Sequence, residues 1–430
     1  MYKSSVLNNG ITVVTEKIPH FRSVSAGLWF KSGSMYETDE TGGISHFIEH
    51  MLFKGTYKRS AKQIADLMDG IGGQLNAFTA KEYTCYYFKV LDEHLETGLE
   101  LLADMILNSS FESLEIEKEK GVILEEILMY EDSPEDVAYD LLSDAMFRDH
   151  PLSKPILGEQ SILQSFNRDK ILSFFQEYYS PQSVILSVAG NFDDKQLEDL
   201  IERYFGNWKP VQINGKVLPE IAFGGDVLFR QKDIEQTHMC IGYPGIPLSD
   251  ESIYSLLAFN NLFGGSMSSR LFQKIREDKG LVYSVLSHPS NYTIGGFFTI
   301  YASMKPSNAQ EVLSIITEEI RSLLNDGITP DELNKAKEQL KGNYILGLES
   351  TGSRMNAIGK SQLLLGKITP PEEVLDKINI ITMENVIESM EAIFSTGTAG
   401  ISIIGKDDLS RQASDLIGAR RQIRVPNGQA

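Results

Sequence analysis

The chain has 430 residues, of which 42% are hydrophobic and 23% are charged, a composition typical of globular proteins. Its 40 lysines and arginines against 59 aspartates and glutamates give a formal net charge of -19, which argues against a nucleic-acid partner because phosphate binding needs a basic surface. The chain shows neither a secretory signal nor an apolar span of membrane length. We therefore expect a cytoplasmic protein with no membrane partner.

The acidity and the cysteines each leave two interpretations open. The negative charge serves solubility, or it marks an acidic chamber that attracts cationic peptides. Two cysteines, Cys85 and Cys240, are too few for a disulfide framework. Cys85 lies in a strand-like run and is interpreted as a buried, inert thiol, with a disulfide to Cys240 as the alternative.

In chain order, the first half opens with a glycine-bounded segment over residues 42–55 that predicts a short helix. Lys54 complements the C-terminal dipole of this helix, and Gly55 suits its end. Gly72 and Gly73 predict a turn that leads into an extended segment. The remaining elements predicted in this half are a strand over 83–90, helices over 95–106, 112–130 and 169–178, and a strand over 184–191.

The second half repeats this order. Its predicted elements are a strand over 296–301, helices over 309–325, 330–346 and 383–393, and a strand over 399–406. Paired elements lie about 215 residues apart, which indicates two homologous domains rather than a solenoid. We expect an α+β fold with mostly antiparallel or mixed sheets flanked by helices. The predicted division is a domain over 1–210, a linker over 211–224 and a domain over 225–430.

The strongest local signal is the pattern His46-x-x-Glu49-His50. Histidines four residues apart lie on one face of a helix, one turn from each other, and can meet a single tetrahedral metal ion. Glu49 flanks the same face and can take a proton from water beside the metal. Chance produces this spacing rarely in a chain with seven histidines, so a metal site is favoured over isolated core or surface histidines.

The acidic helix over 112–130 offers the third ligand. Glu119 and Glu126 border its apolar stripe, and a carboxylate at the edge of a buried face must be paired or bind metal. Periodicity alone does not separate Glu125 from Glu126. A solvated acidic face accounts for the remaining glutamates of this helix: Glu112, Glu115 and Glu117.

With this motif and the duplicated halves, the chain resembles the pitrilysin-like zinc metallopeptidases over nearly its whole length. Its size resembles the subfamily of dimeric subunits related to mitochondrial processing peptidase. The resemblance implies one Zn²⁺ per chain and selects Glu126 as the third ligand, with Glu119 orienting the site. It also implies that the two domains form half of a clamshell and that a homodimer completes it. The second half has no such motif around residues 257–262.

Two further segments are similar to elements of that family. The segment that includes Asn76, Ala77, Phe78 and Thr79 resembles its substrate strand, where an extended peptide adds to a sheet edge. An ordinary hairpin is the alternative. The run that includes Arg276 and Tyr283 resembles its Arg/Tyr element, in which Tyr283 would donate to the oxyanion and Arg276 would grip a substrate carbonyl. On its own, Arg276 could equally pair with nearby acids.

The resemblance therefore implies a zinc-dependent endopeptidase that cleaves peptides or small unfolded proteins inside a dimeric chamber, with Glu49 activating the water. Two other hypotheses remain. One is a noncatalytic scaffold subunit of the same fold, like the core subunits of the bc1 complex, which typically lose metal-motif residues. The other is a zinc hydrolase of a different substrate, which the peptide-binding segments disfavour.

Overall fold

The computed structural model describes residues 2–211, 218–417 and 423–424. Residues 212–217 of the predicted linker 211–224 lie outside this described part. Contacts divide the chain into two compact units. Unit 1 contains Met1–Leu128, Lys154–Leu218 and Leu346–Pro370, and unit 2 contains Met129–Ser153, Pro219–Ile345 and Pro371–Ala430. Each unit has a mixed six-stranded sheet and its own apolar core.

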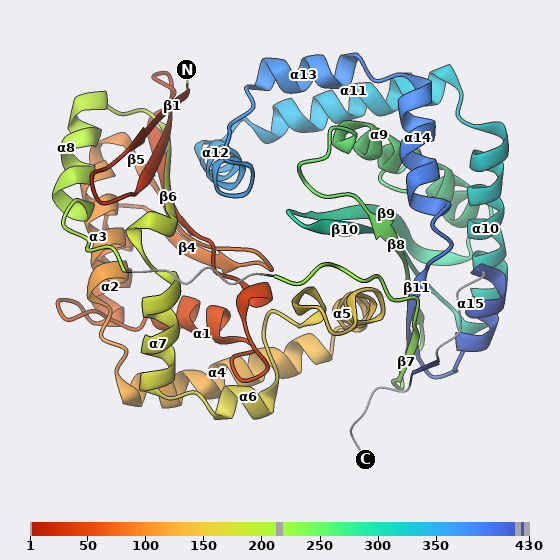
Figure 1. Ribbon diagram of the computed structural model, residues 1–430, viewed down its shortest axis with the longest axis horizontal. Coiled ribbons are helices and arrows are strands. Elements are labelled where there is room, and N and C mark those ends of the chain that lie inside the picture. The colour runs from red at the N-terminus through yellow and green to blue at the C-terminus, as the bar shows by residue number, and fades with distance from the viewer. Residues whose placement is uncertain (1, 212–217, 418–422, 425–430) are drawn as a thin grey trace. The chain divides into compact units, whose positions relative to one another are not determined.

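The sheet of unit 1 has the strand order β1-β2-β6-β3-β5-β4; strands β1, β4, β5 and β6 are labelled in Figure 1. Among the described strands of this sheet, only the β2–β6 pair is parallel. Its strands are β1 (Tyr2–Val6), β2 (Thr12–Lys17), β3 (Ser23–Phe30), β4 (Gln74–Thr79), β5 (Thr84–Leu91) and β6 (Val184–Gly190). The helices that begin in this unit are α1 (Ile44–Met51), α2 (Ala61–Gly70), α3 (Leu95–Asn108), α4 (Ser113–Glu131), α6 (Gln160–Gln164), α7 (Arg168–Tyr178), α8 (Asp194–Phe205) and α12 (Thr351–Leu365).

The sheet of unit 2 has the order β12-β7-β11-β8-β10-β9. Its strands are β7 (Val227–Gln231), β8 (Thr237–Gly245), β9 (Val282–Tyr292), β10 (Gly295–Met304), β11 (Gly400–Gly405) and β12 (Ile423–Arg424). The helices that begin in this unit are α5 (Pro134–Phe147), α9 (Ile253–Phe263), α10 (Ala309–Asp326), α11 (Pro330–Gly347), α13 (Pro371–Asn379), α14 (Met383–Phe394) and α15 (Ser410–Ile417), together with a π-helical segment, Phe272–Glu277.

Matching strands occupy matching places in the two sheets. In each, a parallel pair (β2–β6, β7–β11) leads to three antiparallel strands, and the hairpin β4–β5 corresponds to β9–β10. The predicted α+β class with mixed, helix-flanked sheets is thus confirmed, and the strands and helices predicted in chain order all occur. One detail differs: α1 ends at Met51, and Gly55 (φ +123°) follows a further turn rather than ending the helix.

The compact units are not continuous segments of the chain, and the predicted domain boundaries at 211–224 stay a prediction. Helix α12 packs on the first sheet, where a side chain at Gly359 would collide with the Trp29 indole. The Thr351 hydroxyl also lies 2.9 Å from that of Ser25. Each sheet has an apolar face that must be covered, and the cover for the first sheet comes from a helix late in the chain.

Helix α5, yellow in Figure 1, covers the second sheet in the same way. A side chain at Gly400 would collide with Met146 of this helix, and one at Gly242 would press tightly against Leu142 and Met146. The Ser402 hydroxyl donates a hydrogen bond to the carbonyl oxygen of Ala138 at 2.6 Å. The chain therefore exchanges one helix in each direction between its two halves.

Cys85 and Cys240 are both free and buried. This agrees with the interpretation of Cys85 as a buried thiol. Burial raises the pKa of each thiol. Within the described residues, none of the helices combines the length and the apolar character needed to cross a membrane.

Candidate metal centre

Helix α1 carries the two histidines and is held at its N-terminus by a buried carboxylate. The backbone N–H groups of Gly43 and Ser45 donate to the two oxygens of Glu37 at 2.7 and 2.8 Å. Gly43 has φ +88°, and a side chain there would meet the Leu157 carbonyl oxygen. Burial raises the pKa of Glu37, and the two backbone hydrogen bonds oppose that shift. The role of Glu37 was not predicted from the sequence, in which the only signal is an acid six residues before a glycine that precedes a helix.

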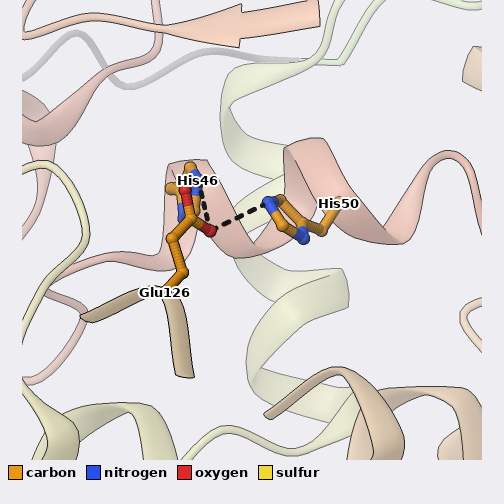
Figure 2. Close-up of side chains that lie close together, drawn as sticks. All are labelled: His46, His50 and Glu126. Carbon is orange, nitrogen blue, oxygen red and sulfur yellow. Dashed lines mark ion pairs between the residues drawn. The ribbon is translucent and has the colours of Figure 1, made fainter. Parts of the chain in front are cut away.

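The rings of His46 and His50 lie 4.6 Å apart between centroids, on the same face of α1, as their spacing predicts. Figure 2 shows one carboxylate oxygen of Glu126, from α4, joined by dashed lines to a ring nitrogen of each histidine. The Glu126 Oε2 atom lies 3.7 Å from His46 Nε2 and 3.5 Å from His50 Nε2. One ligand atom from each of the three residues falls within 4.8 Å of the other two, and this is the one such group of three found among the described residues.

These three side chains fit a tetrahedral zinc ion. With metal–ligand bonds of about 2.0–2.1 Å, adjacent ligand atoms in a tetrahedron lie roughly 3.3 Å apart, close to the spacing seen here. Burial, followed by the charge of His50, lowers the pKa of His46 to about 3, so this imidazole is neutral, as a metal ligand must be. Its Nδ1 is buried and has no hydrogen-bond partner among the described residues.

Glu119 contacts this group from one layer further out, and its role in orienting the site stays a prediction. Its Oε1 lies 2.8 Å from His50 Nδ1, and its Oε2 lies 2.5 Å from the ammonium group of Lys54. Burial raises the pKa of Glu119, but the hydrogen bonds from His50 and Lys54 outweigh this effect and lower it overall. An ionised Glu119 accepts the Nδ1–H of His50, which leaves the Nε2 lone pair directed toward Glu126. From the sequence, Lys54 was predicted only as a cation at the helix end.

Glu49 lies beside this group without joining it. Burial raises the pKa of Glu49, while a hydrogen bond from the Thr79 hydroxyl and the charge of His50 oppose the shift. A raised pKa makes a carboxylate a stronger proton acceptor, as a general base requires. Glu125, which periodicity alone did not separate from Glu126, is exposed on α4 and lies outside the group.

The predicted substrate segment forms β4, which pairs only with β5 and is thus an edge strand among the described residues. Its side chains alternate between two faces. Phe78 packs against Trp29 at 5.8 Å between ring centroids, whereas Thr79 points to Glu49. Asn76 is exposed, as its predicted contact with a peptide requires, and Ala77 is partly buried. That these four residues bind substrate remains a prediction.

Arg276 and Tyr283 lie together in unit 2. The Arg276 guanidinium is 4.8 Å from the ring centroid of Phe272 and 6.0 Å from that of Tyr283. Tyr283 is 74% exposed at the start of β9. Arg276 has no ion pair in the described part of the chain, so the alternative that it serves only to neutralise nearby acids lacks support. The roles predicted for the two residues on a substrate stay predictions.

A paired-histidine helix, a carboxylate from a second helix and a neighbouring glutamate on this duplicated fold define the class of metallopeptidases with the inverted zinc motif. Two family models match the chain. "Insulinase (Peptidase family M16)" covers residues 12–160, and "Peptidase M16 inactive domain" covers residues 165–340.

Curated relatives match at high identity. The chain is 48% identical over 388 residues to "Uncharacterized zinc protease YmxG" of Bacillus subtilis, covering 90% of this chain and 94% of that protein. It is 41% identical over 412 residues to an uncharacterized zinc protease of Rickettsia felis, covering 95% and 98%. The chain belongs to peptidase family M16, which confirms the predicted pitrilysin-like family. The narrower placement beside dimeric processing-peptidase subunits stays a prediction.

Solved structures share the fold. A protease from Helicobacter pylori superposes with a TM-score of 0.88 at 22% identity, covering 94% of this chain and 99% of that one. A Pseudomonas fluorescens structure described as a peptidase M16 inactive domain gives 0.87 at 18% identity, covering 95% and 98%. At these identities the likeness concerns the fold alone.

Proposed function

We propose that this chain is a zinc-dependent endopeptidase that cleaves peptides or small unfolded proteins, with Glu49 as the general base. The observation that carries the proposal is the convergence of His46, His50 and Glu126, whose ligand atoms lie within 4.8 Å of one another. Beside them lies the carboxylate of Glu49, whose pKa is raised. Relatives named zinc proteases support zinc as the metal. One ion per chain follows from a single group of this kind among the described residues.

His46, His50 and Glu126 would hold the zinc. Bound there, it would polarise the peptide carbonyl and lower the pKa of water toward about 7. Glu49 is near enough to His50 and Glu126 for their charges to affect its pKa. Its carboxylate takes the proton of the attacking water and later delivers a proton to the leaving amine. Glu119 keeps His50 in the tautomer that offers Nε2 to the metal.

The substrate proposal rests on β4. The outer edge of this strand presents backbone N–H and C=O groups with which an extended peptide can form hydrogen bonds. Such backbone pairing does not depend on the side chains of the peptide. That mode of binding suits unfolded polypeptide and disfavours a small-molecule substrate. Arg276 and Tyr283 are candidate residues for gripping the peptide and the oxyanion. A homodimer that encloses the substrate is the assembly we propose, and light scattering of the purified protein would measure it.

Digestion of a random peptide library, read by mass spectrometry, tests this function. Purified protein with zinc should cleave the library, and a chelator should stop cleavage until zinc is restored. Glu49→Gln should abolish cleavage while zinc content, measured by elemental analysis, stays unchanged. Glu125→Gln serves as a matched control on an exposed carboxylate and should retain full activity. Full activity of Glu49→Gln would remove this residue as the base.

The alternative is a noncatalytic scaffold subunit. The match of residues 165–340 to the inactive-domain model concerns the segment after the metal motif, whereas His46, Glu49, His50 and Glu126 are all present in unit 1. A zinc-loaded protein that binds library peptides and releases them uncut would favour the scaffold.

A further inference from the structure

One contact ties the edge strand β4 to the proposed base. The hydroxyl of Thr79, the last residue of β4, donates a hydrogen bond of 2.5 Å to Oε2 of Glu49. Phe78, the preceding residue, packs on the opposite face of the sheet against Trp29 and Tyr83. Because strand side chains alternate between faces, the packed Phe78 ring fixes the direction in which Thr79 points.

The neighbouring hydroxyls determine where the Thr79 proton goes. Thr84 lies directly across from Thr79 in the β4–β5 ladder, and their hydroxyl oxygens are 3.3 Å apart. The Thr84 hydroxyl is 2.7 Å from the carbonyl oxygen of Ser32. A carbonyl oxygen only accepts, so the single proton of Thr84 is used there. Thr84 therefore has no proton for Thr79, and the proton of Thr79 is directed to the shorter contact with Glu49.

We propose that Thr79 is a positioning residue that holds Oε2 of Glu49 and so reserves Oε1 for the proton of the attacking water. This inference rests on the proposed function, in which Glu49 is the base. The rotatable bonds of a glutamate side chain allow its carboxylate several orientations. A fixed hydrogen bond restricts the carboxylate to one productive orientation. Thr79 acts through Glu49 and need not touch the substrate, in contrast to the substrate-binding role that its place in the strand predicts.

The same contact links substrate binding to catalysis within one strand. A peptide that adds to the outer edge of β4 would pair with backbone groups there, while the side chain of Thr79 on the inner face restrains the base. Thr79 should therefore affect the chemical step and leave the affinity for peptide almost unchanged, because backbone pairing does not involve its hydroxyl.

The test compares Thr79→Val, which keeps the shape and removes the hydroxyl, with Thr79→Ser, which keeps the hydroxyl. In zinc-loaded protein we expect Thr79→Val to lower kcat about tenfold to a hundredfold, the effect of one hydrogen bond to a charged group, with KM within about twofold. Thr79→Ser should restore most of kcat. Thr237→Val is the matched control, because the Thr237 hydroxyl is buried in unit 2 with no hydrogen-bond partner among the described residues.

A second measurement does not depend on activity. Crystal structures of both variants, with and without zinc, should show Glu49 in several side-chain orientations in Thr79→Val and in one orientation in Thr79→Ser. Zinc content should equal that of the unmodified protein in every variant. If the unmodified zinc protein cleaves nothing, the proposed function fails, while the orientation of Glu49 still decides the role of Thr79.

Three outcomes would overturn the inference. The first is an unchanged kcat in Thr79→Val, and the second is a single unaltered orientation of Glu49 in that variant. The third is a matching loss of zinc in Thr79→Val, which would assign the residue to the integrity of the metal site rather than to the base.

Discussion

The Nδ1 atom of His50 lies 2.8 Å from the Oε1 atom of Glu119, and the second oxygen of this buried carboxylate pairs with Lys54. Two segments far apart in the sequence, α1 and α4, thus share an ionised group behind the proposed metal ligands. The contact fixes the orientation of the His50 ring, since the ring nitrogen that faces Glu119 must carry the proton.

Replacing Glu119 should weaken metal binding. We expect Glu119→Gln to lower zinc affinity by about tenfold to a hundredfold, since the amide holds the His50 tautomer less firmly and no longer neutralises Lys54. Competition with a chromophoric chelator would measure the affinity. Glu117→Gln, at an exposed carboxylate of the same helix, should leave it unchanged. Equal affinities for both variants would contradict a supporting role for Glu119.

Glu126 and Glu125 are adjacent in sequence and differ in position. Glu126 lies within 3.7 Å of both histidines, whereas Glu125 is exposed. Glu126→Gln should lose stoichiometric zinc after dialysis, because an amide oxygen is a weaker ligand than a carboxylate. Glu125→Gln should keep it. Elemental analysis of both proteins decides between them, and the reverse result would reassign the third ligand.

Glu37 should stabilise the helix that carries the histidines. Glu37→Ala leaves the buried N–H groups of Gly43 and Ser45 without their acceptor, at about 1–3 kcal/mol for each. We expect a lower free energy of unfolding in denaturant titrations and weaker zinc binding. Glu40→Ala, at an exposed position nearby, is the control. A Glu37→Ala protein as stable as this control would show that the two contacts contribute little.

The ion pair of Arg270 with Glu332 in unit 2 should make stability depend on pH. Burial raises the pKa of Glu332, but the hydrogen bonds from Arg270 and from Thr329 outweigh it and lower the pKa from 4.5 to about 2. Because the folded-state pKa is depressed, the pair stabilises the fold above about pH 4.5, and this contribution is lost as the pH falls toward 2.

Glu332→Gln should therefore be less stable than the unmodified protein at pH 7, and the difference should shrink as the pH falls below 4.5. Denaturant unfolding at several pH values would measure it. Glu338→Gln, whose carboxylate is exposed and pairs only with Lys341 among the described residues, should show no such convergence. A difference that stays constant from pH 7 to pH 3 would exclude Glu332 as the titrating group.

The exchange of α5 and α12 predicts that the halves of the chain hold together after a break between them. A protease site inserted after Val211, whose side chain is 43% exposed, would allow the folded protein to be cut. The two fragments should elute together in size-exclusion chromatography and separate only in denaturant, because each carries a helix that covers the sheet of the other. Separation in native buffer would show that the exchanged helices contribute little.

Local sequence determined much of this protein. The spacing of His46 and His50 places both rings on one helix face, because one turn of an α-helix takes about 3.6 residues. The glycine pair before β4 and the runs of apolar and aromatic residues in β5 and β6 specify strands by short-range rules. The repeat of these elements in the second half made the duplicated α+β fold predictable as well.

Periodicity left Glu125 and Glu126 open and the family resemblance selected Glu126, but only the tertiary structure shows Glu126 beside the two histidines, because the rotation of α4 depends on how its apolar stripe packs against the rest of unit 1. The same applies to the contacts of Glu37 with α1, of Thr79 with Glu49, and to the exchange of α5 and α12. In each case the two contacting residues or elements are separated along the chain by loops, and these loops are compatible with many relative positions of the elements that they connect. Burial of a shared core selects one of these relative positions. The periodicity within a single helix or strand does not indicate which position is selected.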